Sequence, residues 1–125
     1  MPAYAFTYDI ESTRPDPHKP FLDAAAEEGL LYLRVVGPNV CRLPNTTVWG
    51  IFQTRALAAA AFERAVKAAA KTTGKPVNVE KRLSFSLQDS GYISDVKKLP
   101  EPDWTGSNDF ETARLHQLFD DFFDE

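Results

Sequence analysis

The alanine-rich stretch from Thr54 to Gly74 constrains the fold of this chain more than any other segment. Thr54 is a suitable helix N-cap, and Gly74 is a suitable helix end. Between them, apolar side chains recur at three- and four-residue spacing, with charged side chains largely off that stripe. Alanine favours helix, and its small side chain lets a helix lie close to a sheet. The segment therefore predicts a long amphipathic helix packed against strands.

Two other segments alternate with period two, as half-buried strands do. In residues 3–10 the aromatic and β-branched side chains fall on one face, and Ala3, Ala5, Thr7 and Asp9 fall on the other. In residues 77–87 the apolar side chains also share one face, with Lys81 as the one charge among them. We expect Arg82 and Ser84 on the opposite, wet face, together with Asp9.

The remaining segments complete an alternating order of strands and helices. Residues 20–29 predict a short helix that begins at a proline and ends at a glycine. Residues 30–36 and 46–52 predict two strands of an antiparallel hairpin, and residues 40–43 extend one or the other. The order strand, helix, strand, strand, helix, strand predicts an α+β, ferredoxin-like βαββαβ fold: one four-stranded antiparallel sheet with two helices on one face.

Length and composition fit one globular domain with an extension. The chain has 125 residues, of which 43% are hydrophobic and 26% charged, with no apolar run long enough to span a membrane and no leader. We expect a ferredoxin-like domain over 1–90, a linker over 91–108 and an acidic aromatic segment over 109–125. One cysteine, Cys41, cannot form an intrachain disulfide, which fits a reducing cytoplasm and also a secreted protein without disulfides. By default we expect a cytoplasmic protein without a membrane partner.

Charge is distributed unevenly along the chain. The formal net charge is −4, and residues 109–125 hold six acids against Arg114 alone, which leaves +1 for residues 1–108. A neutral body needs a local basic cluster or a metal ion to hold nucleic acid. The candidates for such a cluster, which are otherwise solvated surface side chains, are Lys75, Lys81, Arg82, Lys97 and Lys98.

Asp9 is the strongest candidate for chemistry. It lies near the end of the first predicted strand, on the face away from the predicted core. A carboxylate there can bind Mg²⁺, which takes one or two protein carboxylates and completes its shell with water. Two copies across a dimer axis could hold one metal ion and activate water against a phosphate. Alternatively, Asp9 caps the loop that follows it.

Two short motifs relate the chain to a known family. The first predicted strand ends with Tyr8-Asp9-Ile10, and the second strand of the predicted hairpin begins with Thr46-Thr47-Val48-Trp49. With these motifs the chain resembles the small CRISPR-associated nuclease of the spacer-integration complex and the related virulence-associated protein D toxins. The resemblance implies a ferredoxin-like homodimer that binds or cleaves nucleic acid with Mg²⁺. It further implies that Asp9 is the metal ligand and that Thr46 or Thr47 lies near the same catalytic site. Lys81, Arg82 and Ser84 would then contact nucleic acid.

The acidic extension supports a different function. It sets bulky apolar side chains among acids, and such a segment can dock in a hydrophobic groove with a basic rim or cover a nucleic-acid-binding surface by mimicking phosphate. The alternative to a nuclease is therefore a non-enzymatic interaction protein that binds a protein partner through Phe110, Leu118, Phe119 and Phe122. The segment can also pack on its own domain. A third function, binding of a small molecule by an α+β dimer, has no recognisable set of pocket residues in the sequence.

The aromatic side chains of the first strand also allow two interpretations. Tyr4, Phe6 and Tyr8 can stack exposed bases, as sheet aromatics do in RNA-recognition modules. They can instead form the core, which is the simpler interpretation because the opposite face of the strand cannot supply one.

Overall fold

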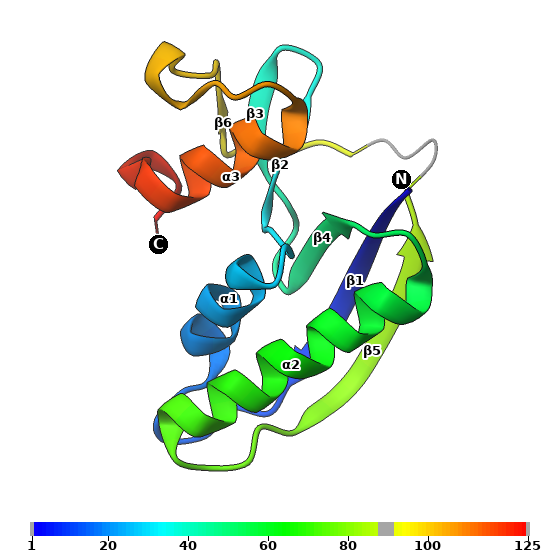
Figure 1. Ribbon diagram of the computed structural model, residues 1–125. Coiled ribbons are helices and arrows are strands. Elements are labelled where there is room, and N and C mark those ends of the chain that lie inside the picture. Colours follow the sequence, from blue (N-terminus) through cyan, green and yellow to red (C-terminus); the bar gives the residue numbers. More distant parts are fainter. Residues whose placement is uncertain (1, 88–91, 125) are drawn as a thin grey trace.

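The computed structural model describes residues 2–87 and 92–124 and shows an α+β protein. The first sheet has the order β4-β1-β5, with β1 (Ala3–Ile10) between β4 (Thr47–Ile51) and β5 (Val79–Ser86). Both neighbours run antiparallel to β1. Two helices, α1 (His18–Glu27) and α2 (Arg55–Thr73), lie side by side over one face of this sheet (Figure 1).

The alanine-rich segment forms α2 as its sequence predicts. Thr54 caps the helix by accepting the Leu57 backbone N–H at 3.2 Å, and Gly74 ends it in a left-handed conformation at φ 75°. The prediction for α1 is less accurate, since that helix begins two residues before Pro20. Asp16 explains the early start: its Oδ1 accepts the His18 backbone N–H at 3.0 Å and so supports the first turn.

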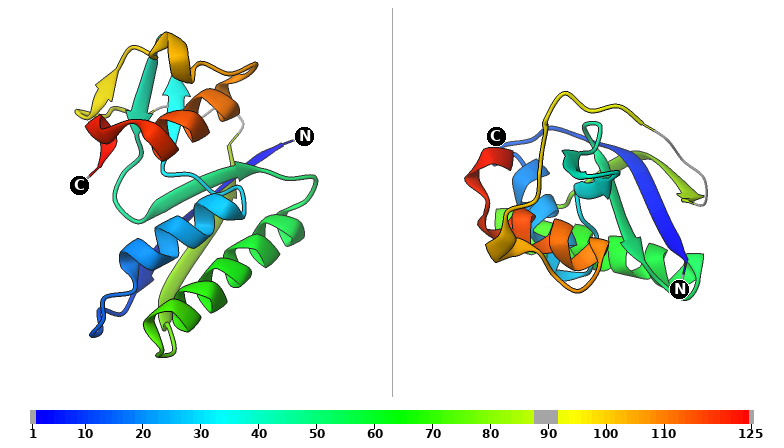
Figure 2. Two further views of the ribbon diagram at one scale, coloured as in Figure 1. Left: turned by 60° about the vertical axis from the view of Figure 1, so that its left-hand side comes forward. Right: turned by 90° about the horizontal axis from the view of Figure 1, so that it is seen from above.

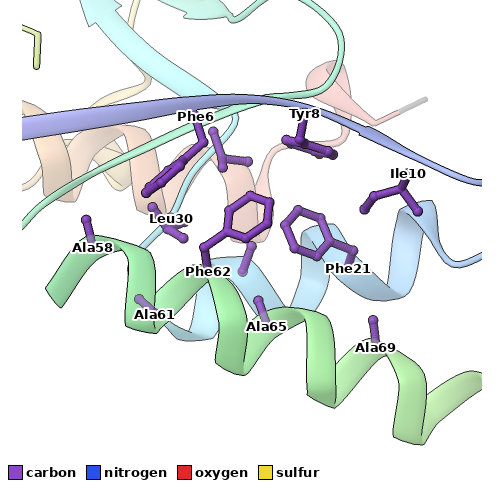
Figure 3. Packing of buried hydrophobic residues seen from close by; sticks show 12 residues of the cluster. Phe6, Tyr8, Ile10, Phe21, Leu30, Ala58, Ala61, Phe62, Ala65 and Ala69 are labelled. Atoms are coloured by element: carbon purple, nitrogen blue, oxygen red, sulfur yellow. The ribbon is translucent and has the colours of Figure 1, made fainter. Parts of the chain in front are cut away.

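The main core lies between the first sheet and the two helices (Figure 3). Phe62 of α2 packs its ring 5.1 Å from Phe6 of β1 and 5.0 Å from Phe21 of α1. Tyr8 packs edge-on against Phe21 at 4.9 Å. The aromatic side chains of β1 therefore belong to the core under the helices, which confirms the simpler interpretation and leaves no exposed ring face for the alternative, base stacking.

A second sheet packs against the face of the first sheet that α1 and α2 leave open (Figure 2). Its order is β2-β3-β6, built from β2 (Leu33–Val36), β3 (Asn39–Arg42) and β6 (Lys97–Lys98). The helix α3 (Asp109–Phe119) packs against β2 and β3. Two short 3₁₀ helices, η1 (Pro102–Trp104) and η2 (Asp121–Phe123), flank α3. Both β6 and η1 lie within the segment 91–108, for which we expected a linker.

The prediction of a single four-stranded sheet is therefore only partly correct. Leu31 alone reaches the first sheet, through a bridge to Trp49 with backbone hydrogen bonds of 2.7 and 2.9 Å. The chain then turns away, and β2 pairs with β3 across a two-residue turn. Gly37 adopts φ 58° in that turn, a conformation that glycine allows and that hairpins of two-residue loops require. Leu33–Val36 therefore pair with β3 and not with β4 as expected.

Candidate functional site

The face of the first sheet opposite the helices is covered over only half of its length. At the start of β1, Ala5 is buried under the second core, which includes Leu33, Leu43 and Trp49. At the end of β1, Asp9 is exposed. Asp9 thus lies on the face away from the two helices, in the uncovered half, as expected from its position in the alternating pattern.

A hollow of about 290 Å³ surrounds Asp9. Lys81 on β5 lies directly opposite Asp9 in the antiparallel register, so the two side chains share a face. Thr7 and Thr46 line the same hollow, as does Leu83, whose side chain is 63% exposed. The structure therefore brings together an exposed carboxylate, an exposed ammonium group and two hydroxyl residues from three separate segments.

The two candidate threonines have different environments. Thr46 stands just before β4 at φ 56°, its Oγ1 donates to the Asn45 carbonyl at 2.6 Å, and its own carbonyl accepts the Tyr8 backbone N–H at 3.1 Å. Thr47 is buried and pairs with Thr7 across β1 and β4. Only Thr46 lines the hollow around Asp9, because Thr47 lies deeper, under the second sheet.

Arg82 and Ser84 lie on the face of β5 opposite that of Asp9, which corrects the prediction of a shared face, although Arg82 still lines the hollow. A bulge between Asp9 and Ile10 leaves Glu80 as an extra residue in β5, since Asp9 pairs with Lys81 but Ile10 pairs with Val79. The bulge reverses the alternation, so residues 82 and 84 fall on the helix-covered face. The Arg82 guanidinium accordingly lies 5.2 Å from the Phe62 ring centroid, and its Nη1 donates to Glu63 at 2.7 Å.

The remaining lysines fall into two groups. Lys75 lies after α2, where its Nζ donates to the carbonyl of Arg14, and both side chains are exposed near the end of the sheet that holds Asp9. Sequence reasoning missed Arg14, because only the fold brings the loop after β1 next to the end of α2. Lys97 and Lys98 form β6 in the second sheet and contribute nothing to the hollow.

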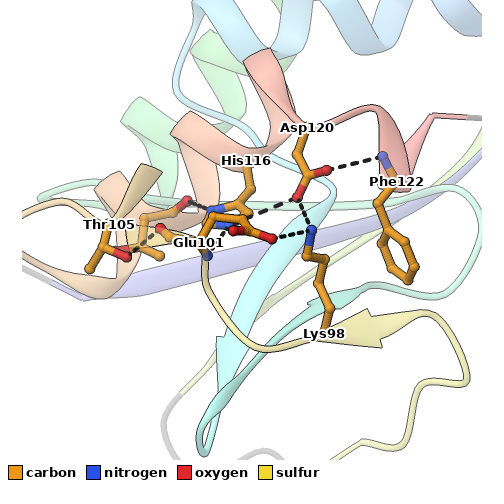
Figure 4. A network of polar contacts seen from close by, with 7 residues as sticks. Lys98, Glu101, Thr105, His116, Asp120 and Phe122 are labelled. Atoms are coloured by element: carbon orange, nitrogen blue, oxygen red, sulfur yellow. Dashed lines mark hydrogen bonds and ion pairs between the residues drawn. The ribbon is translucent and has the colours of Figure 1, made fainter. Parts of the chain in front are cut away.

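Lys98 is part of a separate polar network that joins β6 to the C-terminus (Figure 4). Its Nζ lies 3.0 Å from Oδ2 of the buried Asp120 and 3.1 Å from Oε1 of Glu101. The hydrogen bond to Asp120 raises the pKa of Lys98 above its ordinary value. Asp120 Oδ1 in turn accepts the Phe122 backbone N–H at 3.1 Å. These groups hold the C-terminal segment in place.

The C-terminal candidates also have different environments. Phe110 packs into the second core, with its ring edge-on to Trp49 at a centroid distance of 5.6 Å. Leu118, Phe119 and Phe122 are each more than half exposed. The buried side of α3 consists of Thr112, Ala113 and His116, so Leu118 and Phe119 lie on its outer side.

The residues around Asp9 offer a metal ion few ligands. Within residues 2–87 and 92–124, no three His, Cys, Asp or Glu side chains gather in a way that could hold a metal ion. In the hollow, Asp9 is the one carboxylate, and Lys81 faces it. Mg²⁺ accepts a single protein carboxylate per chain when water fills the remaining positions. One chain therefore provides at most half of a site with two carboxylates.

Comparisons with protein-family models, curated proteins and solved structures gave no match to this chain. Across the described residues, every helix is too short or too polar to cross a membrane.

Proposed function

We propose that the protein is a small nucleic-acid-binding protein of the metal-dependent nuclease type, which acts as a homodimer in the cytoplasm. The observation that supports this function is the exposed carboxylate of Asp9 at the end of β1, in a hollow that also contains Lys81 and Thr46. We further propose that the fold is a ferredoxin-like variant, in which the bridge between Leu31 and Trp49 is what remains of the strand next to β4.

The charges around the hollow suit a phosphate group that approaches together with a cation. Lys81 supplies a positive charge on the same face as Asp9, and Arg14 and Lys75 add two exposed positive charges toward the same end of the sheet. Lys and Arg side chains contact phosphate independently of base sequence. Strong salt dependence and weak sequence preference are therefore the expected binding properties.

A second copy of the chain completes the site in this proposal. The half of the sheet face that holds Asp9 is left uncovered by the second sheet, so a second copy would meet the chain across this face. The Asp9 side chains of the two copies would then face each other and hold one Mg²⁺, which when bound would polarise phosphate oxygens and lower the pKa of a coordinated water. Lys81 would neutralise the phosphate, and Thr46 would fix its position at the rim.

The test uses the purified full chain with labelled single- and double-stranded RNA and DNA, in Mg²⁺, in Mn²⁺ and in EDTA. We expect cleavage or binding that requires the divalent ion and falls at least tenfold in Asp9→Asn. Asp103→Asn is the matched control, since Asp103 is an exposed carboxylate in η1 that is absent from the hollow. Equal activity of Asp9→Asn and the wild type would remove Asp9 from the site. Absence of both binding and cleavage on all four substrates would reject this function.

The three exposed apolar side chains at the C-terminus favour a second candidate function. Leu118, Phe119 and Phe122 lie next to the exposed acids Asp121 and Asp124. A protein partner with an apolar, basic-rimmed groove would fit this composition. Phe119→Ser tests the idea by pull-down from the native cell extract, with Leu57→Ser as the control, because Leu57 is half exposed on α2. Retention of the same bound proteins by both variants would reject it.

A further inference from the structure

A histidine and three charged side chains meet where β6 and the segment after it lie against the end of α3 (Figure 4). Lys98 Nζ lies 3.0 Å from Oδ2 of Asp120 and 3.1 Å from Oε1 of Glu101. The same Asp120 oxygen lies 3.9 Å from Nε2 of His116. The buried carboxylate of Asp120 therefore lies between an ammonium group and an imidazole, and this arrangement has no role in the proposed function.

The hydrogen bonds of His116 require a neutral ring. Nδ1 lies 2.9 Å from the carbonyl oxygen of Thr112, which can only accept, so Nδ1 carries the ring proton. Nε2 then has a free lone pair, and it accepts the backbone N–H of Glu101 at 3.0 Å. The ring is fully buried, so water does not substitute for either partner. The bond from Glu101 exists only while Nε2 carries no proton.

Two polar contacts join residues 98–105 to α3 and its C-terminal cap. One is the ion pair between Lys98 and Asp120, and the other is the hydrogen bond from Glu101 to His116. The strand β6 adds little support, because it pairs with β3 over only two residues. Both contacts therefore end at the same place, where the Asp120 carboxylate and the His116 ring lie next to each other.

Asp120 is the acid that a protonated His116 ring would meet. Histidine is the side chain whose charge changes between about pH 5 and pH 8. A buried positive charge needs an opposite charge beside it, and the carboxylate of Asp120 is itself buried next to the ring. The carboxylate of Glu101 points to Lys98 instead.

Within the described residues, the other elements around the ring present no competing acid. The short helices η1 and η2 face it with the aromatic rings of Trp104 and Phe123. On α3 itself, Glu111 pairs with Arg114. The strands β2 and β3 also pack against α3. Their titratable and charged groups have other neighbours: Arg34 lies over Trp49, Arg42 lies over Tyr32, and the Cys41 thiol lies near Lys97.

We propose that this network is a pH-sensitive switch, in which Asp120 exchanges Lys98 for His116 as its partner when the imidazole takes up a proton. The new proton on Nε2 makes that nitrogen a donor, so it no longer accepts the N–H of Glu101. A charge-assisted bond of about 2.7–2.9 Å to Asp120 needs a shift of only about 1 Å from the present distance. Both contacts of residues 98–105 with α3 are lost together, so this segment detaches as the pH falls and returns as it rises.

The switch is independent of the proposed function, since none of its groups lines the hollow around Asp9. The experiment records amide hydrogen exchange and the ring resonances of both histidines in the full-length protein between about pH 8 and pH 5. We expect the protection factor of the Glu101 amide to fall about tenfold or more as the His116 ring titrates. The protection factor of Phe6, in the centre of β1, should stay constant because the first sheet remains folded.

Two variants make the test specific. His116→Gln keeps an oxygen that can accept the Glu101 N–H but takes up no proton, so protection at Glu101 should no longer depend on pH. His18→Gln is the matched control, because His18 lies on the surface beside Asp16, and it should behave as the wild type. Asp120→Asn removes the charge that stabilises the protonated ring, so the loss of protection at Glu101 should move to lower pH.

Three results would overturn the switch. The first is constant protection at Glu101 in the wild type across this pH range. The second is a loss that Phe6 shares, which would indicate acid unfolding of the whole chain. The third is a loss at the same pH in Asp120→Asn as in the wild type, and this comparison decides the matter even where His116→Gln does not fold. An equal loss in a folded His116→Gln would have the same meaning, because the proton would then bind elsewhere.

Discussion

The imidazole Nε2 of His116 accepts the backbone N–H of Glu101 at 3.0 Å, which joins α3 to the segment that precedes it. The other ring nitrogen, Nδ1, lies 2.9 Å from the Thr112 carbonyl oxygen. Since a carbonyl only accepts, we assign the ring proton to Nδ1. The ring is fully buried and meets Trp104 edge-on, with a centroid distance of 5.5 Å. Both nitrogens are satisfied within the fold, so His116 is a structural residue.

Replacing His116 should therefore destabilise the protein. His116→Leu keeps the apolar contacts of the ring but leaves the partly buried N–H of Glu101 without its acceptor, which costs about 1–3 kcal/mol. The free energy of unfolding in urea measures this loss. His18→Leu is the control, because His18 pairs with Asp16 on the surface, and its replacement should cost less than about 1 kcal/mol. Similar losses in the two variants would contradict a structural role for His116.

Deleting residues 109–125 should unfold the second sheet. Ala113 and Phe123 are buried in the second core, and Phe110 packs against Trp49. Removing these side chains exposes the apolar surfaces of β2 and β3 to water. We expect the near-ultraviolet circular dichroism of the tryptophans to collapse and the thermal transition to broaden. Phe119→Ser is the control, and its spectrum should stay native because that side chain is more than half exposed. A native spectrum for the deletion would show that α3 is dispensable.

The alanine stripe of α2 should tolerate no larger side chain. Ala65 is fully buried against the first sheet (Figure 3), so Ala65→Leu forces the helix and the sheet apart and should cost about 1–3 kcal/mol. Ala56→Leu adds the same atoms at an exposed position of the same helix and should change stability by less than about 0.5 kcal/mol. Chemical denaturation of both variants measures the difference. Equal stability would mean that α2 does not lie close to the sheet in solution.

Elements with strong local patterns were predictable from the sequence. The alternation of Tyr4, Phe6, Tyr8 and Ile10 predicted both the span of β1 and its core face, and the caps at Thr54 and Gly74 predicted α2. Asp9 was placed on the correct face because no irregularity precedes it in β1. In each of these cases the local pattern and the tertiary packing favour the same structure.

The errors come from features that one strand alone does not reveal. The bulge at Glu80 exists only in relation to β1, and it moves Arg82 and Ser84 to the helix-covered face. The second sheet forms because the chain pairs with β4 only at Leu31, and because Lys97 and Lys98, which are distant in the sequence, pair with β3. Single-segment periodicity contains no information about such distant pairings, so the candidate site was found only in part.

Gly50 should be irreplaceable, because the chain after α1 passes directly over it. A Cβ at Gly50 would stand 2.2 Å from the carbonyl oxygen of Gly29, which is backbone and cannot swing aside. Gly50→Ala should therefore break the bridge between Leu31 and Trp49 and cost about 1–3 kcal/mol, as other overpacked cores do. Gly37→Asn is the control: no atom lies within 4 Å of its Cβ position, and asparagine tolerates the positive φ. Amide hydrogen exchange at Leu31 and Trp49 should accelerate in Gly50→Ala alone, and unchanged exchange there would refute the close approach.

Stability should fall at alkaline pH, because burial raises the pKa of Tyr92 from 10.0 to about 12 and also raises the pKa of Tyr8. Below pH 10 the folded and the unfolded chain both keep the phenol protons of Tyr8 and Tyr92, so these two groups do not make the stability depend on pH. Between pH 10 and about 12 the unfolded chain has already lost the Tyr92 proton that the folded chain retains, so rising pH favours unfolding. The difference in absorbance at 295 nm between the wild type and Tyr92→Phe should show a phenol that ionises near pH 12. The urea midpoint of unfolding should decline less steeply with rising pH in the variant than in the wild type. A Tyr92 phenol that ionises near its ordinary pKa of 10.0 would instead place its hydroxyl in water and contradict its burial.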